Sequence, residues 1–115
     1  VCWAGVSDAK ATYEERVDMR RGLRRVIGGT PNKFPERYRE RTPLYQVKHI
    51  EAPVFIVHGE MDQHVSIEHA YKLEKALKAA GKVVNSMYAV NMPHHYSPRF
   101  NREMVRNICQ WMKVQ

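Results

Sequence analysis

This sequence has few cysteines and no long apolar run. Its 115 residues contain two cysteines, Cys2 and Cys109, which are too few for a disulfide framework. Both lie in apolar patterns, so we expect buried free thiols and a cytoplasmic protein. A membrane-spanning helix needs roughly 18 consecutive apolar residues, and no stretch of this chain approaches that length. We therefore expect no contact with a membrane.

The sequence also has no solid block of one charge. Lys and Arg outnumber Asp and Glu by 19 to 12, a net charge of +7, but both halves of the chain are basic. The densest cluster, Arg20, Arg21, Arg24 and Arg25, has helical spacing and predicts one solvated helix face. Because no recognition helix, zinc finger or aromatic RNA-binding surface accompanies these charges, we expect no binding to nucleic acid.

What the sequence does contain is a regular alternation of strand and helix signals. Apolar residues make up 43% of the chain and charged residues 27%, as in soluble globular domains. The expected order is a strand at 1–6, a helix at 12–27, a short helix at 35–41, a strand from 53, a helix at 67–80, a strand at 83–90 and a helix from about 101. This alternation predicts an α/β fold of about three parallel strands with flanking helices. The strand at 1–6 begins abruptly, and we expect a fragment of a larger domain.

Local signals predict where the first helices begin and end. Thr12 and Glu15 have the spacing of a capping box, in which each side chain satisfies a backbone N–H of the first turn. Gly28 and Gly29 would end this helix, because glycine adopts the left-handed conformation without strain. Pro35 is well placed to start the short helix that follows.

Apolar spacing predicts which side of each helix faces the core. Ser66 is the expected cap of the first of the two later helices, and Asn101 or a near neighbour that of the last. Lys72, Lys75 and Lys78 are expected to point away from the core. The expected inward residues are Val17, Leu23, Val26 and Ile27 in the first helix, Ile67, Ala70, Leu73, Leu77 and Ala80 in the second of the long helices, and Met104, Val105, Ile108, Trp111 and Met112 in the last.

The stretch from Pro53 to Val65, PVFIVHGEMDQHV, organises the chain. It opens with four apolar residues without alternation and turns polar around Gly59, a pattern typical of a parallel strand buried on both faces. In open α/β sheets the functional residues lie just beyond the carboxyl ends of such strands. Asp62 occupies that position.

Two adjacent histidines follow the next expected strand. His94 and His95 lie on a loop at the carboxyl end of that strand, on the same side of the sheet as Asp62. A carboxylate bonded to one imidazole nitrogen fixes the tautomer and stabilises the imidazolium that forms when the other nitrogen takes a proton. The order Asp then His, with a serine upstream, is that of α/β-hydrolases. Asp62 and His94 are therefore candidates for the acid and base of a Ser-His-Asp triad.

Two segments carry a specific family resemblance. Residues 35–44, PERYRERTPL, and 50–62, IEAPVFIVHGEMD, resemble the catalytic domain of the prolyl oligopeptidase family of serine peptidases. That family has a tyrosine, a Ser-Pro pair, a connector, an apolar strand and the motif His-Gly-x-x-Asp-x-x-Val in this order. The helix at 67–80, the histidine loop and the terminal helix also match. The resemblance covers essentially the whole chain and implies the C-terminal portion, residues 1–115, of an α/β-hydrolase domain.

The resemblance also implies roles for individual residues. Asp62 becomes the triad acid and His94 the base, with a peptide or an ester as substrate and no cofactor or metal. The family has a glycine before its catalytic histidine and Gly-Phe after it, whereas here Pro93 precedes His94, and His95 and Tyr96 follow. His95 stands in place of a glycine, which leaves His95 as the alternative base.

The nucleophile of such a triad is missing from this chain. None of the four serines, Ser7, Ser66, Ser86 and Ser97, lies in Gly-x-Ser-x-Gly, whose glycines the strained nucleophile turn requires. We therefore expect a piece of a serine peptidase that supplies the acid and the base, with the serine upstream. This piece alone should be inactive.

Other interpretations of the same residues stay open. Asp62 could simply cap the turn that follows it, and His58 is expected to be structural. His58, His64 and His69 could be considered as zinc ligands, but spacings of six and five residues match no familiar ligand pattern. A non-catalytic alternative is a fragment that forms homo-oligomers through the unpaired edge of the strand at 1–6.

Overall fold

The centre of the molecule is a three-stranded parallel sheet. The computed structural model describes all 115 residues, and its strands β1 (Cys2–Trp3), β2 (Val54–Gly59) and β3 (Val84–Ala89) lie in the order β1-β2-β3. β2 pairs with β3 over its whole length, whereas β1 contributes only two pairs, one of them Cys2 with Ile56. The predicted parallel sheet is confirmed. The strand expected at 1–6 is much shorter than predicted.

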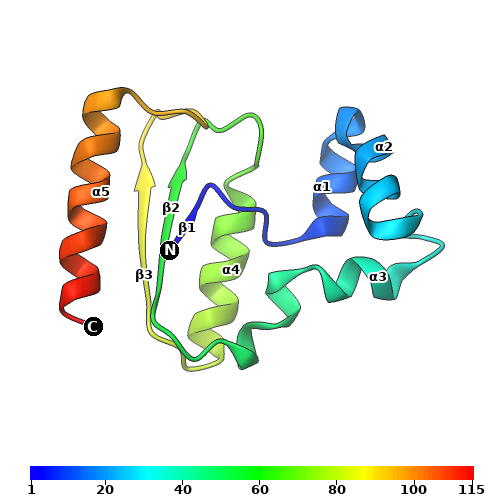
Figure 1. Cartoon of the computed structure of the whole chain (residues 1–115), viewed down its shortest axis with the longest axis horizontal. Helices are drawn as coiled ribbons and strands as arrows, with labels where there is room; N and C mark the ends of the chain where they lie inside the picture. Colours follow the sequence, from blue (N-terminus) through cyan, green and yellow to red (C-terminus); the bar gives the residue numbers. More distant parts are fainter.

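Two long helices cover the two faces of this sheet. α4 (Glu68–Ala79) packs on one face and α5 (Pro98–Lys113) on the other, as Figure 1 shows. All six residues of β2 are buried, because alternate side chains enter opposite cores. The α4 side is built from Val54, Ile56, Ala70, Leu73 and Leu77. The α5 side is built from Phe55, Val57, Ala89, Tyr96, Met104 and Ile108. The prediction of a strand buried on both faces is confirmed.

A helical arm between β1 and β2 lies beyond α4, away from α5 (Figure 1). It consists of α1 (Ala9–Glu15), a 3-10 turn (Val17–Met19), α2 (Arg20–Leu23), a π-helical turn (Arg24–Gly28) and α3 (Pro35–Glu40). Two further 3-10 turns, Pro43–Tyr45 and Val47–His49, lead into β2. The helix that begins at Pro35 is confirmed to within one residue.

The continuous helix predicted from Thr12 to Ile27 is wrong. α1 begins three residues earlier, because the Asp8 carboxylate accepts a hydrogen bond from Ala11 N–H at 3.1 Å. Thr12 lies inside the helix, where its hydroxyl donates to the Asp8 carbonyl. The helix then breaks at Arg16, whose backbone has φ −117° and ψ 87°.

The break at Arg16 also changes which side chains the arm buries. Val17 and Val26, predicted to be in the core, are 70% and 67% exposed, while Leu23 and Ile27 are half-buried. The predicted stop is confirmed, because Gly28 and Gly29 have φ values of 96° and 109°.

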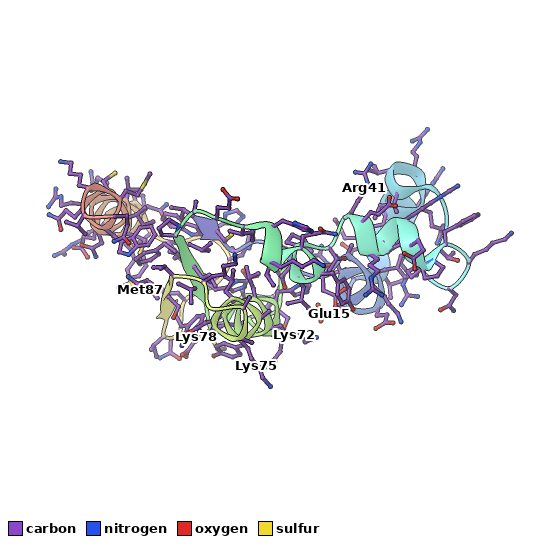
Figure 2. The ribbon with its side chains drawn as sticks, turned by 90° about the horizontal axis from the view of Figure 1, so that it is seen from below. Glu15, Arg41, Lys72, Lys75, Lys78 and Met87 are labelled. Carbon is purple, nitrogen blue, oxygen red and sulfur yellow. The ribbon has the colours of Figure 1, made fainter.

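Of the two later helices, α4 follows the predicted pattern more closely, although Ala80, predicted to face the core, is exposed. Ser66 Oγ accepts a hydrogen bond from Glu68 N–H at the start of α4, and Gly81, with φ 71°, follows its end. Figure 2 shows Lys72, Lys75 and Lys78 on the side of α4 that faces away from the sheet, as predicted. No helix is both long and apolar enough to cross a membrane.

The start and part of the inward face predicted for α5 differ from the structure. The cap, predicted at Asn101 or a near neighbour, is Ser97, four residues earlier, which accepts a hydrogen bond from Phe100 N–H. Met104 and Ile108 are buried and Trp111 is half-buried, but Val105 and Met112 are exposed, together with Cys109. Both cysteines are free thiols, as predicted. Neither is fully buried, because Cys2 is half-buried and Cys109 is exposed.

Candidate active site

The loops that follow β2 and β3 meet at one edge of the sheet. The two strands end side by side, with Gly59 opposite Ala89. Backbone hydrogen bonds then join the loops, from Glu60 N–H to Ala89 O at 3.0 Å and from Met61 N–H to Met92 O at 2.9 Å. These bonds hold the residues after β2 against the histidine loop after β3.

Asp62 stands in the first of these loops with its carboxylate fully buried. Its Oδ1 atom accepts hydrogen bonds from His64 N–H at 2.8 Å and Val65 N–H at 2.9 Å, and Oδ2 lies 2.8 Å from His94 Nδ1. Burial alone would raise the pKa of Asp62, but the hydrogen bonds from Val65, His94 and His64 together outweigh it and hold this pKa below its ordinary value. The carboxylate is therefore ionised at neutral pH and aimed at His94.

His94 is the histidine that the structure places against Asp62. Its Nδ1 atom faces the carboxylate, its side chain is 27% exposed, and its Nε2 atom makes no hydrogen bond within the chain. Because the partner of Nδ1 is an acceptor, Nδ1 carries a proton and Nε2 of the neutral ring is free to accept one. A base with this tautomer can take a proton from a hydroxyl placed at Nε2.

His94 lies between two surface hollows. On one side the hollow is lined by Trp3, Ala4, His95, Tyr96, Asn101 and Val105. On the other it is lined by Met61, Gln63, His64, Asn91, Pro93 and His95. Of these residues, Tyr96 carries a buried hydroxyl without a hydrogen-bond partner.

His95 takes a different position from His94. It is exposed, forms no hydrogen bond and does not contact the Asp62 carboxylate. Its ring centroid lies 4.9 Å from that of His94, and the ring of His64 lies 5.1 Å from His94 on the other loop. The imidazoles of His64 and His95 therefore lie beside the His94 ring, but neither ring is bonded to the Asp62 carboxylate.

The remaining histidines that were considered as metal ligands do not come together. His58 is buried at the end of β2, and its Nε2 atom lies 2.8 Å from Val65 O and 3.4 Å from Asp62 Oδ2. His69 is buried on α4, where Nδ1 accepts hydrogen bonds from the backbone of Ser7 and Asp8. No group of three or more His, Cys, Asp or Glu side chains has an arrangement that could hold a metal ion.

None of the four serine hydroxyls forms a hydrogen bond with His94. Ser7 Oγ donates to the His69 carbonyl at 2.7 Å, while Ser66 and Ser97 use their hydroxyls at the starts of α4 and α5. Ser86 lies within β3, opposite Ile56. The site therefore holds a carboxylate and an imidazole in contact, with no serine hydroxyl bonded to them.

Two contributors to this site were missed by sequence reasoning. A Cβ atom on Gly59 would lie 2.5 Å from Pro93 O and closer still to Met92 O, so only glycine lets the histidine loop approach β2. Arg16, at the break in the arm, donates from Nη1 to His64 O at 2.7 Å. The glycine could have been suspected from its position at a strand end, whereas no local pattern indicates the contact of Arg16.

Three parallel strands with helices on both faces, and an acid and an imidazole at their carboxyl ends, define a partial α/β-hydrolase fold. The acylaminoacyl peptidase of Pyrococcus horikoshii superposes on 84% of this chain with a TM-score of 0.74 and 26% sequence identity, using 16% of its own chain. A puromycin-hydrolyzing peptidase of Mycobacterium tuberculosis superposes on 81% with a TM-score of 0.75, using 14% of its chain; at 23% identity this likeness concerns the fold alone.

The whole chain, residues 1–115, matches the model of the prolyl oligopeptidase family, and it belongs to that family of peptidases. The uncharacterized peptidase YtmA of Bacillus subtilis (strain 168) is 54% identical over 113 residues, which are 98% of this chain and 44% of YtmA. The uncharacterized peptidase YuxL of the same organism is 34% identical over 80 residues, which are 66% of this chain and 12% of YuxL. The chain thus spans less than half the length of these relatives.

Proposed function

We propose that this chain is the C-terminal portion of an α/β-hydrolase domain and supplies the acid and the base of a serine peptidase. Asp62 is the acid and His94 the base, and the nucleophilic serine comes from sequence outside these 115 residues. The observation that carries the proposal is the 2.8 Å contact between Asp62 Oδ2 and His94 Nδ1, with Nε2 of the same ring left without a partner.

The chemistry that follows needs only one further side chain. His94 Nε2 takes the proton from the serine hydroxyl while its oxygen attacks the carbonyl carbon of a peptide or an ester. The imidazolium, stabilised by Asp62, then gives that proton to the leaving amine or alcohol, and the acyl-enzyme remains. A water molecule then attacks the acyl-enzyme in the same way, with His94 as base, and releases the carboxylic acid product. The serine, Asp62 and His94 return to their starting states.

Three observations support a nucleophile from outside the chain. The serines present are engaged elsewhere, as described above, and the curated relatives are more than twice as long as the part that matches. In addition, the unpartnered hydroxyl of Tyr96 and the hollow beside Trp3 lie next to His94, where a further segment would complete the site. The 115 residues alone are expected to be inactive.

The experiment that tests the proposal is hydrolysis of a small chromogenic ester and a matching peptide anilide. The 115-residue chain is compared with a version extended at its N-terminus, in which Asp62→Asn, His94→Gln and His95→Gln are introduced singly. We expect activity only in the extended protein, a loss of turnover on the order of 10⁴ for Asp62→Asn, and a similar or larger loss for His94→Gln.

His95→Gln is the matched control, because it makes the same substitution on the adjacent exposed residue. It should retain most of the turnover. Hydrolysis by the 115-residue chain would contradict the external serine, and loss of turnover in His95→Gln but not in His94→Gln would exchange the roles of the two histidines.

Self-association through the edge of β1 has less support as a function. β1 offers only two residues at that edge, and very short edge strands pair poorly with other chains. In the proposed peptidase the same edge receives the neighbouring strand of the domain. Sedimentation of the extended protein as a monomer would agree with this assignment of the edge.

A further inference from the structure

The carboxylate of Asp62 accepts three hydrogen bonds and has one further close neighbour, His58. An ionised carboxylate offers about four lone-pair positions. Two on Oδ1 are taken by the backbone N–H groups of His64 and Val65, and one on Oδ2 is taken by His94. The remaining side of Oδ2 faces His58 Nε2 at 3.4 Å.

His58 donates a hydrogen bond to the turn that carries this carboxylate. Its Nε2 atom lies 2.8 Å from the Val65 carbonyl oxygen, which can only accept, so Nε2 carries a proton. The ring is buried at the end of β2, with 1% of its side chain exposed. It therefore binds the far end of the Asp62 turn, at the Val65 carbonyl, and lies 3.4 Å from the carboxylate itself.

We infer that His58 is a positioning residue that holds the Asp62 carboxylate in line with His94. The inference rests on the proposed function, since it assigns His58 a part in the same site without contact to a reacting atom. The Asp62 turn spans residues 60–65; backbone bonds join its start to the loop after β3, and His58 joins its end to β2 through Val65 O. Without the His58 bond the Val65 end of the turn is released, and with it one of the two N–H groups that orient the carboxylate toward His94.

A loosened carboxylate has two consequences for catalysis. The Nδ1–H tautomer of His94 is no longer enforced, and misplacement of a catalytic group by about 1 Å can cost on the order of 10²-fold in rate. The imidazolium also loses part of its stabilisation, so the acid limb of the pH–rate profile moves to lower pH. The other titratable or charged groups that face the pair are His64, His95, Arg16 and Tyr96, and they are unchanged in the test.

The test compares two polar substitutions at His58 in the version of the protein that is extended at its N-terminus. Gln places an amide N–H near the position of Nε2, whereas Asn is too short to reach it. We expect His58→Asn to lower kcat on the order of 10²-fold with little change in KM and to shift the acid limb to lower pH. His58→Gln should keep most of the turnover and the original profile.

The matched control is His69→Asn, the same substitution at the other buried histidine, away from the site. It should lower the melting temperature and leave kcat per folded molecule and the pH profile unchanged. Turnover is expressed per folded molecule from circular dichroism. If His58→Asn does not fold, His58→Val takes its place, because valine suits a strand. Either variant is called donor-free, since it places no N–H group at the position of Nε2, and is compared with His58→Gln.

Equal kcat values and identical pH profiles for the donor-free variant and His58→Gln would overturn the inference, as would the same kinetic change in His69→Asn. Asp62→Asn and His94→Gln are measured beside them. If those two keep full activity, the proposed function itself fails. If they abolish activity while the donor-free His58 variant behaves like wild type, only the positioning role fails.

Discussion

The α-carbon of Gly59 packs against the backbone carbonyl of Pro93, and a Cβ atom at this position would lie 2.5 Å from that oxygen. This contact limits how closely the histidine loop approaches β2, and thereby the distance between Asp62 and His94. Gly59→Ala should force the two loops apart and destabilise the protein by about 1–3 kcal/mol, the usual cost of overpacking. Urea unfolding of the 115-residue chain measures this change.

Gly22→Ala is the matched control for this substitution. Gly22 lies in α2 with open space around its α-carbon, so the added methyl group meets nothing within 4 Å. Alanine should be neutral or stabilise the chain by about 0.4–1 kcal/mol, because it restricts the unfolded backbone. A neutral Gly59→Ala, with the control behaving as expected, would mean that the loops accommodate the methyl group.

The pH dependence of stability should report on Asp62. Its pKa in the folded protein is lowered, so its contribution to the free energy of unfolding is fully present above the unfolded value of about 3.9. That contribution is lost as the pH falls through the folded pKa. Asp62→Asn should therefore be less stable than wild type at pH 7, and the difference should shrink as the pH falls below about 4. Urea unfolding between pH 7 and pH 3 measures it.

Asp18→Asn provides the comparison on an exposed carboxylate. Asp18 pairs with Arg16 at the surface of the arm, where solvent screens the interaction. This variant should stay close to wild type throughout the pH range. A difference between Asp62→Asn and wild type that stays constant down to pH 3 would contradict the role of the ionised carboxylate.

The parts of the fold that could be predicted from the sequence are those decided by short-range patterns. Four consecutive apolar residues from Val54 and the glycine that ends them correctly predicted β2, and the stripe from Ala70 to Leu77 correctly predicted the buried face of α4. The parallel order of the strands followed from their alternation with helices. With both loops at one sheet edge, the proximity of Asp62 and His94 also followed from topology.

The arm was mispredicted because two capping signals compete there. Thr12 and Glu15 have the spacing of a capping box, but Asp8 also provides a capping carboxylate four residues earlier, and tertiary contacts favour the earlier start. Ala9 N–H binds Thr42 Oγ1 from the far end of the arm, and the backbone of Ser7 binds His69. Such contacts join residues more than 30 positions apart, and no local pattern contains them.

The inward face of α5 gives a direct stability test with one residue type. Met104 is 2% exposed between α5 and the sheet, whereas Met112 on the same helix is 58% exposed. Met104→Ala should cost about 2–5 kcal/mol of unfolding free energy, because it leaves a cavity in the core. Met112→Ala should change it by less than about 0.5 kcal/mol, as for other surface sites. Similar losses in both variants would indicate that a different face of α5 is buried.

His69 should hold the helical arm against α4. Its Nδ1 atom accepts hydrogen bonds from Ser7 N–H at 3.2 Å and Asp8 N–H at 3.3 Å, and Nε2 lies 3.2 Å from Glu15 Oε2 on α1. His69→Leu removes the acceptor and leaves the N–H groups of Ser7 and Asp8 unpaired, at about 1–3 kcal/mol for each. We expect a lower melting temperature and faster amide hydrogen exchange in α1 than in β2. His49→Leu, at an exposed histidine, should change neither, and slow exchange of α1 in His69→Leu would show that the arm is held by other contacts.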